Sequence, residues 1–329
     1  MKIQKFKEML KQIQEERNIN KEDIVSALQE ALLLAARKRF PDKETVEVKL
    51  SEEGEAQIYD QGIDITPSDF GRLAAQTAKQ VILQRIREAE KDGIFKEYQE
   101  KVGQLINGTV QRREPYGYMI NIGRIETFLS FEEAIPGEIF KPHERVRVII
   151  LDVKKSPKGP VVIVSRAHPN FIKLLFEMEV PEIQDKILEI KGIAREPGRR
   201  TKIALVSSDP NVGVVGTCVG QMGGRIQNIT REINGERIDI IEWSDNPKKF
   251  ISSALSPAKS VGIEINEEAK SARVIFDPSE LSLAIGKEGQ NVRLAARLTG
   301  YRIDIISKEE SKKEEIKKDG EKSTDKENA

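Results

Sequence analysis

The sequence contains a single cysteine, Cys218, so no disulfide can form within the chain and a reducing compartment is expected. A catalytic thiol needs a basic partner. Cys218 is flanked by Thr217 and Val219, and we therefore predict a small buried apolar side chain. The two histidines, His143 and His168, are far apart in the sequence with no other soft ligand nearby. We therefore predict no zinc site, no other bound metal and no cofactor.

The chain also lacks net charge, because 54 basic side chains balance 54 acidic ones among its 329 residues. No segment is a polycation, and only residues 103–168 and 247–307 lean positive. Any contact with RNA or DNA must therefore use a focused face and engage few phosphates. The many carboxylates lie in solvated runs, and neither a nucleophile–base pair nor a metal cluster is evident. We predict a protein that is not an enzyme.

Long apolar runs are missing as well. No run of about 18 apolar residues could span a membrane, and the charged, amphipathic N-terminus has no signal-peptide core. We expect a soluble, cytoplasmic protein that has no membrane partner. For its length it should contain two to four domains.

The first part of the chain, residues 1–102, shows helical periodicity and is predicted to form a compact α+β domain without a chemical motif. The apolar residues of its first helix are Ile3, Phe6, Leu10 and Ile13. A second helix should begin at the N-cap Asn20. Alternating residues on both sides of Glu53 predict a hairpin. Thr66 is the expected cap of a third helix that runs to about Gly93 or beyond.

From about Gly103 the periodicity changes to two. Residues 103–168 contain five short alternating segments separated by turns, which predicts a small five-stranded β-barrel of the OB type. The face of its second and third strands would present aromatic side chains and arginines: Tyr116, Tyr118, Phe128, Arg112, Arg113 and Arg124. Such a face suits stacking on unpaired bases. The RNA-binding candidates are Tyr116, Tyr118, Phe128 and Arg113. The competing interpretation is that half of these aromatic side chains fill the barrel.

The next part of the chain repeats itself. The sequences G-Q-M-G at residues 220–223 and G-K-E-G at residues 286–289 each precede a predicted helix, which leads into a strand that reads R-I-D-I-I. Around both, the order helix, strand, strand, helix, helix, strand recurs. We therefore predict two tandem α-β-β-α-α-β domains, residues 169–246 and 247–307.

Two interpretations of these glycine pairs compete. A tight turn between helices needs positive φ, which glycine adopts readily, and this requirement alone would explain them. A loop without side chains would also let a sugar–phosphate backbone approach the amides of a helix N-terminus, beside a groove for about four bases. On the second interpretation, the RNA-binding candidates are Gly220, Gln221, Met222, Gly223, Arg225, Gly286, Lys287, Glu288, Gly289, Asn291 and Arg293.

The last residues, 308–329, mix lysines with acids and contain one large apolar residue, Ile316. Such a segment cannot bury enough apolar surface to offset the entropy of ordering. We therefore predict a disordered tail.

These motifs resemble known families. G-x-x-G between two helices, with a three-stranded sheet, resembles the K-homology (KH) RNA-binding domain, and the helix-first order resembles its bacterial variant, type II. Residues 103–168 resemble the OB barrel repeated in a large RNA-binding protein of the bacterial small ribosomal subunit. The whole order, with the phrases IAREPGRRTKIAL, ALSPAK and LAIGKEGQNVRLAARLTGYRIDI, is similar to the family of the bacterial transcription elongation factor NusA over about residues 1–307.

The resemblance implies a function by binding alone. Residues 1–102 would dock on core RNA polymerase beside the RNA exit channel, while the barrel and both KH domains hold the nascent single-stranded RNA. This would modulate pausing, termination and antitermination, and we expect a monomer that works with other antitermination factors. The first loop has no charge before Arg225, and in the second Lys287 and Glu288 cancel. The acidic C-terminal repeats of some members are missing, so regulation by such a tail is not expected.

Two other assignments use the same modules. Exoribonucleases also carry KH and OB domains, but residues 1–102 are too short for an additional catalytic domain, which leaves an accessory factor in RNA degradation. The other assignment is a factor for ribosome assembly or translation. Binding to core RNA polymerase would separate both from a transcription factor.

Overall fold

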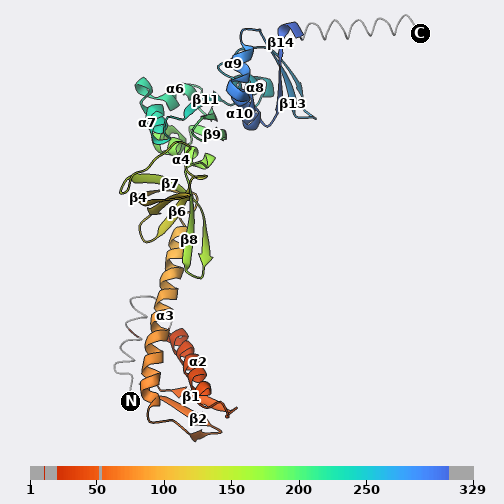
Figure 1. The fold of residues 1–329 in the computed structure, drawn as a ribbon. Coiled ribbons are helices and arrows are strands. Elements are labelled where there is room, and N and C mark those ends of the chain that lie inside the picture. The colour runs from red at the N-terminus through yellow and green to blue at the C-terminus, as the bar shows by residue number, and fades with distance from the viewer. Residues whose placement is uncertain (1–10, 12–20, 52–53, 311–329) are drawn as a thin grey trace, which may run out of the picture. The chain divides into compact units, whose positions relative to one another are not determined.

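The computed structural model describes residues 11, 21–51 and 54–310 (Figure 1). These residues form two compact bodies. The N-terminal body holds the described residues up to Lys101 together with Val153–Val162, and the second body holds Val102–Asp152 and the described residues from Ile163 onward. Some predicted features lie outside the described residues: the helix with Ile3, Phe6, Leu10 and Ile13, its neighbour's cap Asn20, Glu53 of the hairpin turn, and the tail beyond residue 310.

The N-terminal body combines two helices with a small sheet. Helices α2 (Lys21–Arg39) and α3 (Phe70–Gln99) flank, along the chain, strands β1 (Val46–Leu50), β2 (Ala56–Asp60) and β3 (Ile63–Asp64), which pair in that order. Side chains four residues apart lie on one face of a helix. The buried ones are Ile24, Leu28, Leu32 and Ala36 of α2 and Phe70, Ala74, Ala78 and Ile82 of α3. They form one core with Val46 and Ile58 of the sheet, which confirms the predicted α+β fold.

The predicted cap of α3 is wrong. The helix begins at Phe70, and its N-cap Asp69 makes no side-chain capping hydrogen bond. The Thr66 hydroxyl instead accepts a hydrogen bond from the Ile58 amide at 2.8 Å and donates one to Asp64 Oδ1 at 2.5 Å. Thr66 therefore holds the chain against strand β2. Its hydroxyl is already occupied by the Ile58 amide and the Asp64 carboxylate, so it does not cap the helix.

The C-terminal half of α3 packs against the tip of a barrel hairpin, Val153–Val162, inside the N-terminal body. Lys155 Nζ lies 2.8 Å from Asp92 Oδ1, and Lys91 Nζ donates to the Pro157 carbonyl at 3.0 Å. The domain boundary predicted at residue 102 assigns this tip to the barrel. The sequence does not show the contact of the tip with α3, because a contact between distant parts of the chain has no local sequence pattern.

Five strands form the predicted OB-type barrel. They are β4 (Leu105–Glu114), β5 (Gly117–Asn121), β6 (Glu126–Ser130), β7 (Arg145–Ser156) and β8 (Gly159–Ser165), paired in the order β6-β5-β4-β7-β8. The backbone amides of Arg166 and Ala167 donate to the Glu133 carbonyl. These bonds join the segments that follow the two edge strands, so the sheet is nearly closed.

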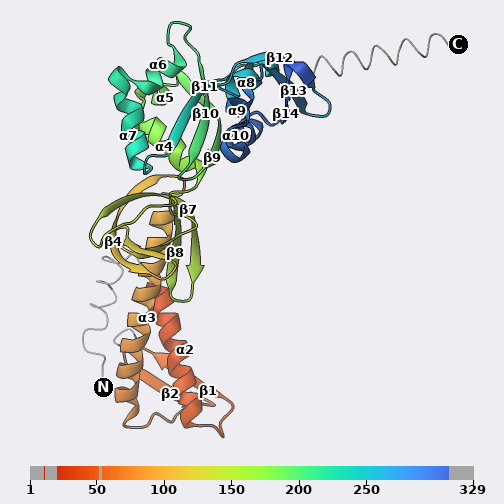
Figure 2. The ribbon, with the colours of Figure 1, turned by 45° about the horizontal axis from the view of Figure 1, so that its top comes forward.

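The first KH unit, residues 169–246, has the predicted order of elements. It contains α4 (Pro169–Glu179), α5 (Pro181–Gln184), β9 (Leu188–Glu196), β10 (Arg200–Ser207), α6 (Val214–Val219), η1 (Gln221–Gly223), α7 (Gly224–Glu232) and β11 (Arg237–Glu242). The short α5 was not predicted. Strand β10 pairs antiparallel with β9 and parallel with β11, and the helices cover one face of this sheet (Figure 2).

The second KH unit, residues 247–307, repeats this arrangement. It contains α8 (Pro247–Ala254), β12 (Ser260–Asn266), β13 (Ser271–Phe276), α9 (Leu281–Ile285), η2 (Lys287–Gly289), α10 (Gln290–Thr299) and β14 (Arg302–Ser307). Strand β13 again pairs antiparallel with one neighbour and parallel with the other. The repeated letters R-I-D-I-I form the parallel edge strand in both units, so the prediction of two tandem type II KH folds is confirmed.

Across the part of the chain that the structure describes, every helix is too short or too polar to cross a membrane.

Candidate nucleic-acid interface

The two G-x-x-G sequences form the same turn. In the first loop, residues 220–223, Gly220 has φ 75° and ψ 177°. In the second loop, residues 286–289, Gly286 has φ 74° and ψ 171°. The third residues, Met222 and Glu288, both lie in the left-handed region, at φ 50° and 54°. The sequence repeat is therefore a repeat of backbone geometry.

The first glycine of each loop is needed for two physical reasons. Positive φ with ψ near 180° is a conformation that only glycine adopts readily. A Cβ on Gly220 would come within 2.7 Å of the Arg225 side chain, and one on Gly286 within 2.9 Å of the Asn291 backbone nitrogen. Both requirements concern the backbone of the turn. By themselves they do not decide whether the glycines only form the turn or also let RNA bind.

Each loop leads directly into a helix that no side chain caps. The N-caps of α7 and α10 are Gly223 and Gly289, and neither can supply a capping side chain. Four side chains of the loops are exposed: Gln221, Lys287, Glu288 and Met222, the last with 95% of its surface. The positive end of a helix dipole favours an anion such as a phosphate. Both loops therefore fit a sugar–phosphate backbone.

Apolar side chains lie exposed beside each loop. The preceding helix α6 exposes 48% of Val215, and α9 exposes 45% of Leu283 and 42% of Ile285. Each of these helices packs against the edge strand of its unit, β11 or β14. Exposed apolar surface next to such a turn is suited to the faces of unpaired bases.

Two residues predicted to bind RNA in the loop regions have structural roles. Asn291 is fully buried, and its Nδ2 donates to the carbonyls of Leu255 and Ala284 at 2.9 and 3.1 Å. This corrects the prediction for Asn291, which faces inward because it begins the buried side of α10. Arg225 is held by Glu182 at 2.9 Å and by the Thr217 carbonyl at 2.8 Å. Its side chain is 31% exposed, so it braces the first loop.

Two further candidates, Arg293 and Glu288, lie at the contact between the KH units. Arg293 Nε is 2.6 Å from Glu196 Oε1, and Arg199 Nη1 is 3.0 Å from Glu288 Oε2. The hydrogen bond from Arg293 lowers the pKa of the Glu196 carboxyl. Sequence reasoning missed Glu196 and Arg199, although their charges on either side of Pro197 mark a turn.

The barrel face agrees with the prediction only in part. Tyr116 is 79% exposed and Phe128 38%, and Arg113 is exposed with its guanidinium 5.6 Å from the Phe131 ring. Phe131, 39% exposed, is an aromatic side chain of this face that the sequence analysis missed. Tyr116, Phe128 and Arg113 remain candidates for stacking on bases.

Tyr118 is a correction, because it is 1% exposed and belongs to the barrel core. Its ring makes edge contacts with Phe131 and Phe140 at 5.5 and 5.2 Å, and its hydroxyl donates to the Glu138 carbonyl at 3.3 Å. The alternation that grouped Tyr116 with Tyr118 fails because Tyr116 lies in the turn before β5. The interpretation that some aromatics fill the barrel holds for Tyr118.

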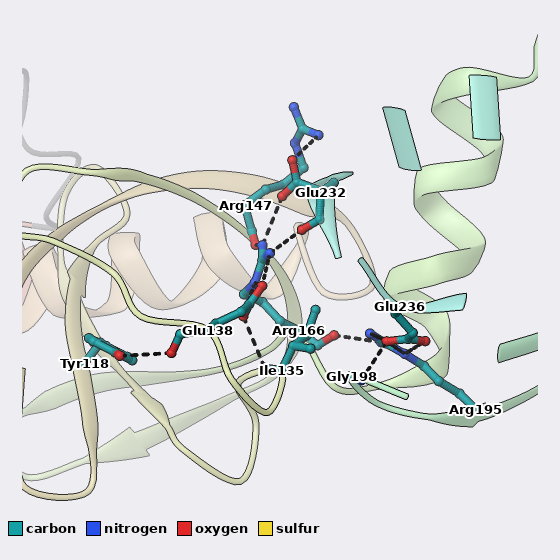
Figure 3. A network of polar contacts seen from close by, with 9 residues as sticks. All are labelled: Tyr118, Ile135, Glu138, Arg147, Arg166, Arg195, Gly198, Glu232 and Glu236. Carbon is teal, nitrogen blue, oxygen red and sulfur yellow. Dashed lines mark hydrogen bonds and ion pairs between the residues drawn. The ribbon is translucent and has the colours of Figure 1, made fainter. Parts of the chain in front are cut away.

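Buried ion pairs join the barrel to the first KH unit (Figure 3). Arg166, which follows β8, lies 2.6 Å from Glu138 and 3.0 Å from Glu232 at the end of α7. Next to it, Arg195 and Glu236 pair at 2.9 Å with both side chains at 0% exposure. The barrel and the first KH unit are thus joined by a continuous network of polar contacts, in which each charged group has a partner of opposite charge.

No group of three or more His, Cys, Asp or Glu side chains in the described ranges could hold a metal ion. Cys218 is fully buried, as predicted, and burial raises the pKa of its thiol to about 11. A thiol with so high a pKa is a poor nucleophile at neutral pH.

A barrel followed by two type II KH folds with matching G-x-x-G turns defines a tandem KH-domain protein. The chain belongs to the NusA family. It matches family models for the NusA N-terminal domain over residues 5–62 and 57–92, the NusA-like first KH domain over residues 166–243 and the NusA-like second KH domain over residues 247–313.

Three similar proteins carry the name transcription termination/antitermination protein NusA. The one from Bacillus subtilis (strain 168) is 42% identical over 333 residues, covering 91% of this chain and 90% of that protein. The one from Thermus thermophilus is 46% identical over 266 residues, covering 80% and 69%. The one from Mycobacterium tuberculosis (strain ATCC 25618 / H37Rv) is 40% identical over 313 residues, covering 89% and 90%.

Proposed function

We propose that this chain acts in transcription termination and antitermination by binding nascent single-stranded RNA and core RNA polymerase, without catalysing a reaction. The observation that carries the RNA part is the pair of G-x-x-G turns, each leading into the N-terminus of a helix that no side chain caps. The name of the relatives supports the proposal that this binding serves transcription termination and antitermination.

The mechanism follows from what the loops can hold. A phosphate at the helix N-terminus accepts hydrogen bonds from backbone amides, and these contacts are independent of sequence. The bases next to it lie against the apolar side chains of α6 or α9. RNA held in this way stays unpaired, and keeping a segment unpaired near its exit from polymerase shifts whether a hairpin forms there. Hairpin formation is the step that such binding would favour or oppose.

Aspartates placed in the loops test the RNA part. Gln221 and Met222 are changed together to aspartate in one variant of the full chain, and Lys287 and Glu288 in another. The added carboxylates would face the incoming phosphates, so affinity for a labelled single-stranded RNA should fall at each site. The fall should be of similar size at the two loops, because each variant lowers the charge of its loop by two. The glycines stay in place, so the free energy of unfolding should change by no more than about 0.5 kcal/mol.

The outcomes of this test are distinct. If neither variant changes RNA affinity, the glycines serve only the turn and the RNA assignment is wrong. If the first pair alone abolishes binding, the two loops are not equivalent clamps.

Salt dependence tests how few phosphates are engaged. With about 3–5 phosphates, log K against log salt should have a slope of about −2 to −3.5 for a single strand. A slope steeper than about −6 would reveal a basic surface that the balanced charge does not suggest. Duplex RNA of the same composition should bind more weakly, since splayed bases are needed.

Polymerase binding is assigned to the N-terminal body. The match to the NusA N-terminal domain supports this assignment. The full chain is mixed with core polymerase without RNA, cross-linked through lysines and analysed by mass spectrometry. Cross-links should concentrate on lysines of the N-terminal body such as Lys43, Lys49 and Lys79. Cross-links confined to the KH units would contradict the assignment, and no complex at all would favour an accessory role in RNA degradation or ribosome assembly.

A further inference from the structure

The tip of the β9–β10 hairpin, residues 196–200, lies against the second loop. Arg199 Nη1 is 3.0 Å from Glu288 Oε2, and the two side chains are 63% and 60% exposed. A residue of the first KH unit therefore stands at the G-x-x-G loop of the second. An ion pair this exposed contributes little to stability, about 0–1 kcal/mol, so stability alone does not account for it.

Other residues of the tip hold it in place. Glu196 accepts hydrogen bonds from Arg293 Nε at 2.6 Å and from Gln290 Nε2 at 2.8 Å, both on α10. The Gly198 amide donates to Glu236 Oε2 at 2.9 Å, inside the buried pair of the first unit. Arg199 is thus presented to the second loop by its neighbours, and its ion pair with Glu288 is not what anchors the hairpin.

The other side of the tip is also occupied. A Cβ on Gly198, which has φ +72°, would come within 3.0 Å of the Pro136 carbonyl of the barrel. The hairpin tip is therefore enclosed by the barrel, by its own unit and by the second KH unit. Its position, and with it that of Arg199, is determined from three sides.

The charge of the second loop depends on this neighbour. The charges of Lys287 and Glu288 cancel, and Glu288 stands in the loop that leads into α10, where a phosphate would approach the helix N-terminus. An unpaired carboxylate there would repel the phosphate. With Arg199 beside it, the three side chains carry a net positive charge, and the carboxylate is drawn onto the guanidinium.

We propose that Arg199 is a positioning residue for RNA, which neutralises Glu288 so that the second loop can accept a phosphate. This inference rests on the proposed RNA binding. The phosphate site of the second KH unit is then incomplete without the first unit. The first loop needs no such partner, since Gln221 and Met222 carry no charge to neutralise.

The experiment is a double-mutant cycle on the full chain with Arg199→Ala, Glu288→Gln and both together. The probe is a labelled single-stranded RNA of about 16 nucleotides, and affinity is measured beside the thermal midpoint of unfolding. Arg199→Ala should weaken binding about fivefold, the effect of an unpaired unit charge near a phosphate in a watery setting. Glu288→Gln added to Arg199→Ala should restore the affinity, because no carboxylate is left to neutralise.

A matched control removes one positive charge from an exposed ion pair elsewhere in the first KH unit. Lys173 lies 3.7 Å from Glu177 on α4, and Lys173→Ala should leave the RNA affinity within about twofold. Unchanged affinity in Arg199→Ala would overturn the inference. So would a loss that Glu288→Gln fails to restore, which would mean a packing role. Absence of RNA binding by the unaltered chain would instead overturn the proposed function.

Discussion

Arg166 and Glu138 form an ion pair that is almost completely withdrawn from water. Nη2 of the arginine lies 2.6 Å from Oε1 of the glutamate, and the side chains are 4% and 5% exposed. The same guanidinium reaches Glu232 of the first KH unit. The barrel and the first KH unit are therefore joined by a charge that neither could bury alone, since an isolated ion in the interior is strongly disfavoured.

Arg166→Met should be strongly destabilising. The change leaves the buried Glu138 carboxylate without its cation, whereas Glu232 keeps Arg147 at 3.3 Å, and removing one partner of a buried pair costs about 3–5 kcal/mol. Lys155→Met is the control, because Lys155 and Asp92 are 63% and 59% exposed and this pair should contribute less than about 1 kcal/mol. Denaturant unfolding followed by circular dichroism measures both. Equal effects of the two changes would show that the buried pair is not a structural joint.

The neighbouring tyrosines of the barrel should respond in opposite ways. Tyr118→Ala removes a ring that is 1% exposed and should cost about 3–5 kcal/mol of stability, as large aromatic truncations in cores do. Tyr116→Ala removes a ring that is 79% exposed. It should leave stability nearly unchanged and weaken RNA binding by about 1–3 kcal/mol if one base stacks on it. RNA titrations of both variants decide the matter, and an unaffected Kd in Tyr116→Ala would remove this residue from the interface.

The first glycines of the two loops should differ in their tolerance of a methyl group. Either substitution by alanine forces a conformation that costs about 1–3 kcal/mol. Gly286→Ala should be the more damaging, because its Cβ would press on the backbone of Asn291, whereas at Gly220 the flexible Arg225 side chain can move. Gly289→Ala is the control: its φ is +71°, but no atom lies within 4 Å of the added Cβ. Thermal unfolding should rank the losses as Gly286, Gly220, Gly289, and the reverse order would refute the steric argument.

Lys202 should make stability depend on alkaline pH. It is fully buried between Asp239 and the Ser256 carbonyl, and burial, partly opposed by Asp239, lowers its pKa from 10.5 to about 8. Between these two values the unfolded chain still binds the proton that the folded chain has lost. Its contribution to stability therefore rises with pH in this window, by at most about 1.4 kcal/mol per pH unit.

Lys202→Met isolates this effect. The free energy of unfolding of the unaltered chain minus that of the variant should increase from pH 8 to pH 10.5. Cys218, whose raised pKa works in the opposite direction, is present in both proteins and cancels. A difference that stays flat across the window would mean that Lys202 keeps its proton in the folded protein.

Much of the fold could be predicted because its signals are local. The five barrel strands follow from alternation between turns, and the two KH units follow from the repeated glycines and the repeated R-I-D-I-I strand. A backbone that needs φ near +75° selects glycine at one position regardless of what lies elsewhere in the chain. The position of each loop could therefore be predicted from the sequence.

The roles of single side chains around these loops were less accessible. Helical periodicity places Asn291 near a loop but does not reveal that the carbonyls of Leu255 and Ala284 bind its amide. The expectation for Tyr118 failed because alternation was carried through a turn. In both cases the contacting residues lie in another element, and a local sequence pattern does not show that they are close in space.

The sequence by itself was sufficient for the order of the domains, the paired turns and the balanced charge, since each depends on composition or on short-range backbone preferences. Only the tertiary structure decided that Arg199 lies on the loop of the other KH unit, opposite Glu288 and 89 positions away in the chain. It also decided that Arg166 satisfies carboxylates of two domains. Both pairings arise because folding brings charges together that are distant in the sequence, and at Arg166 the removal of water makes the partnership obligatory.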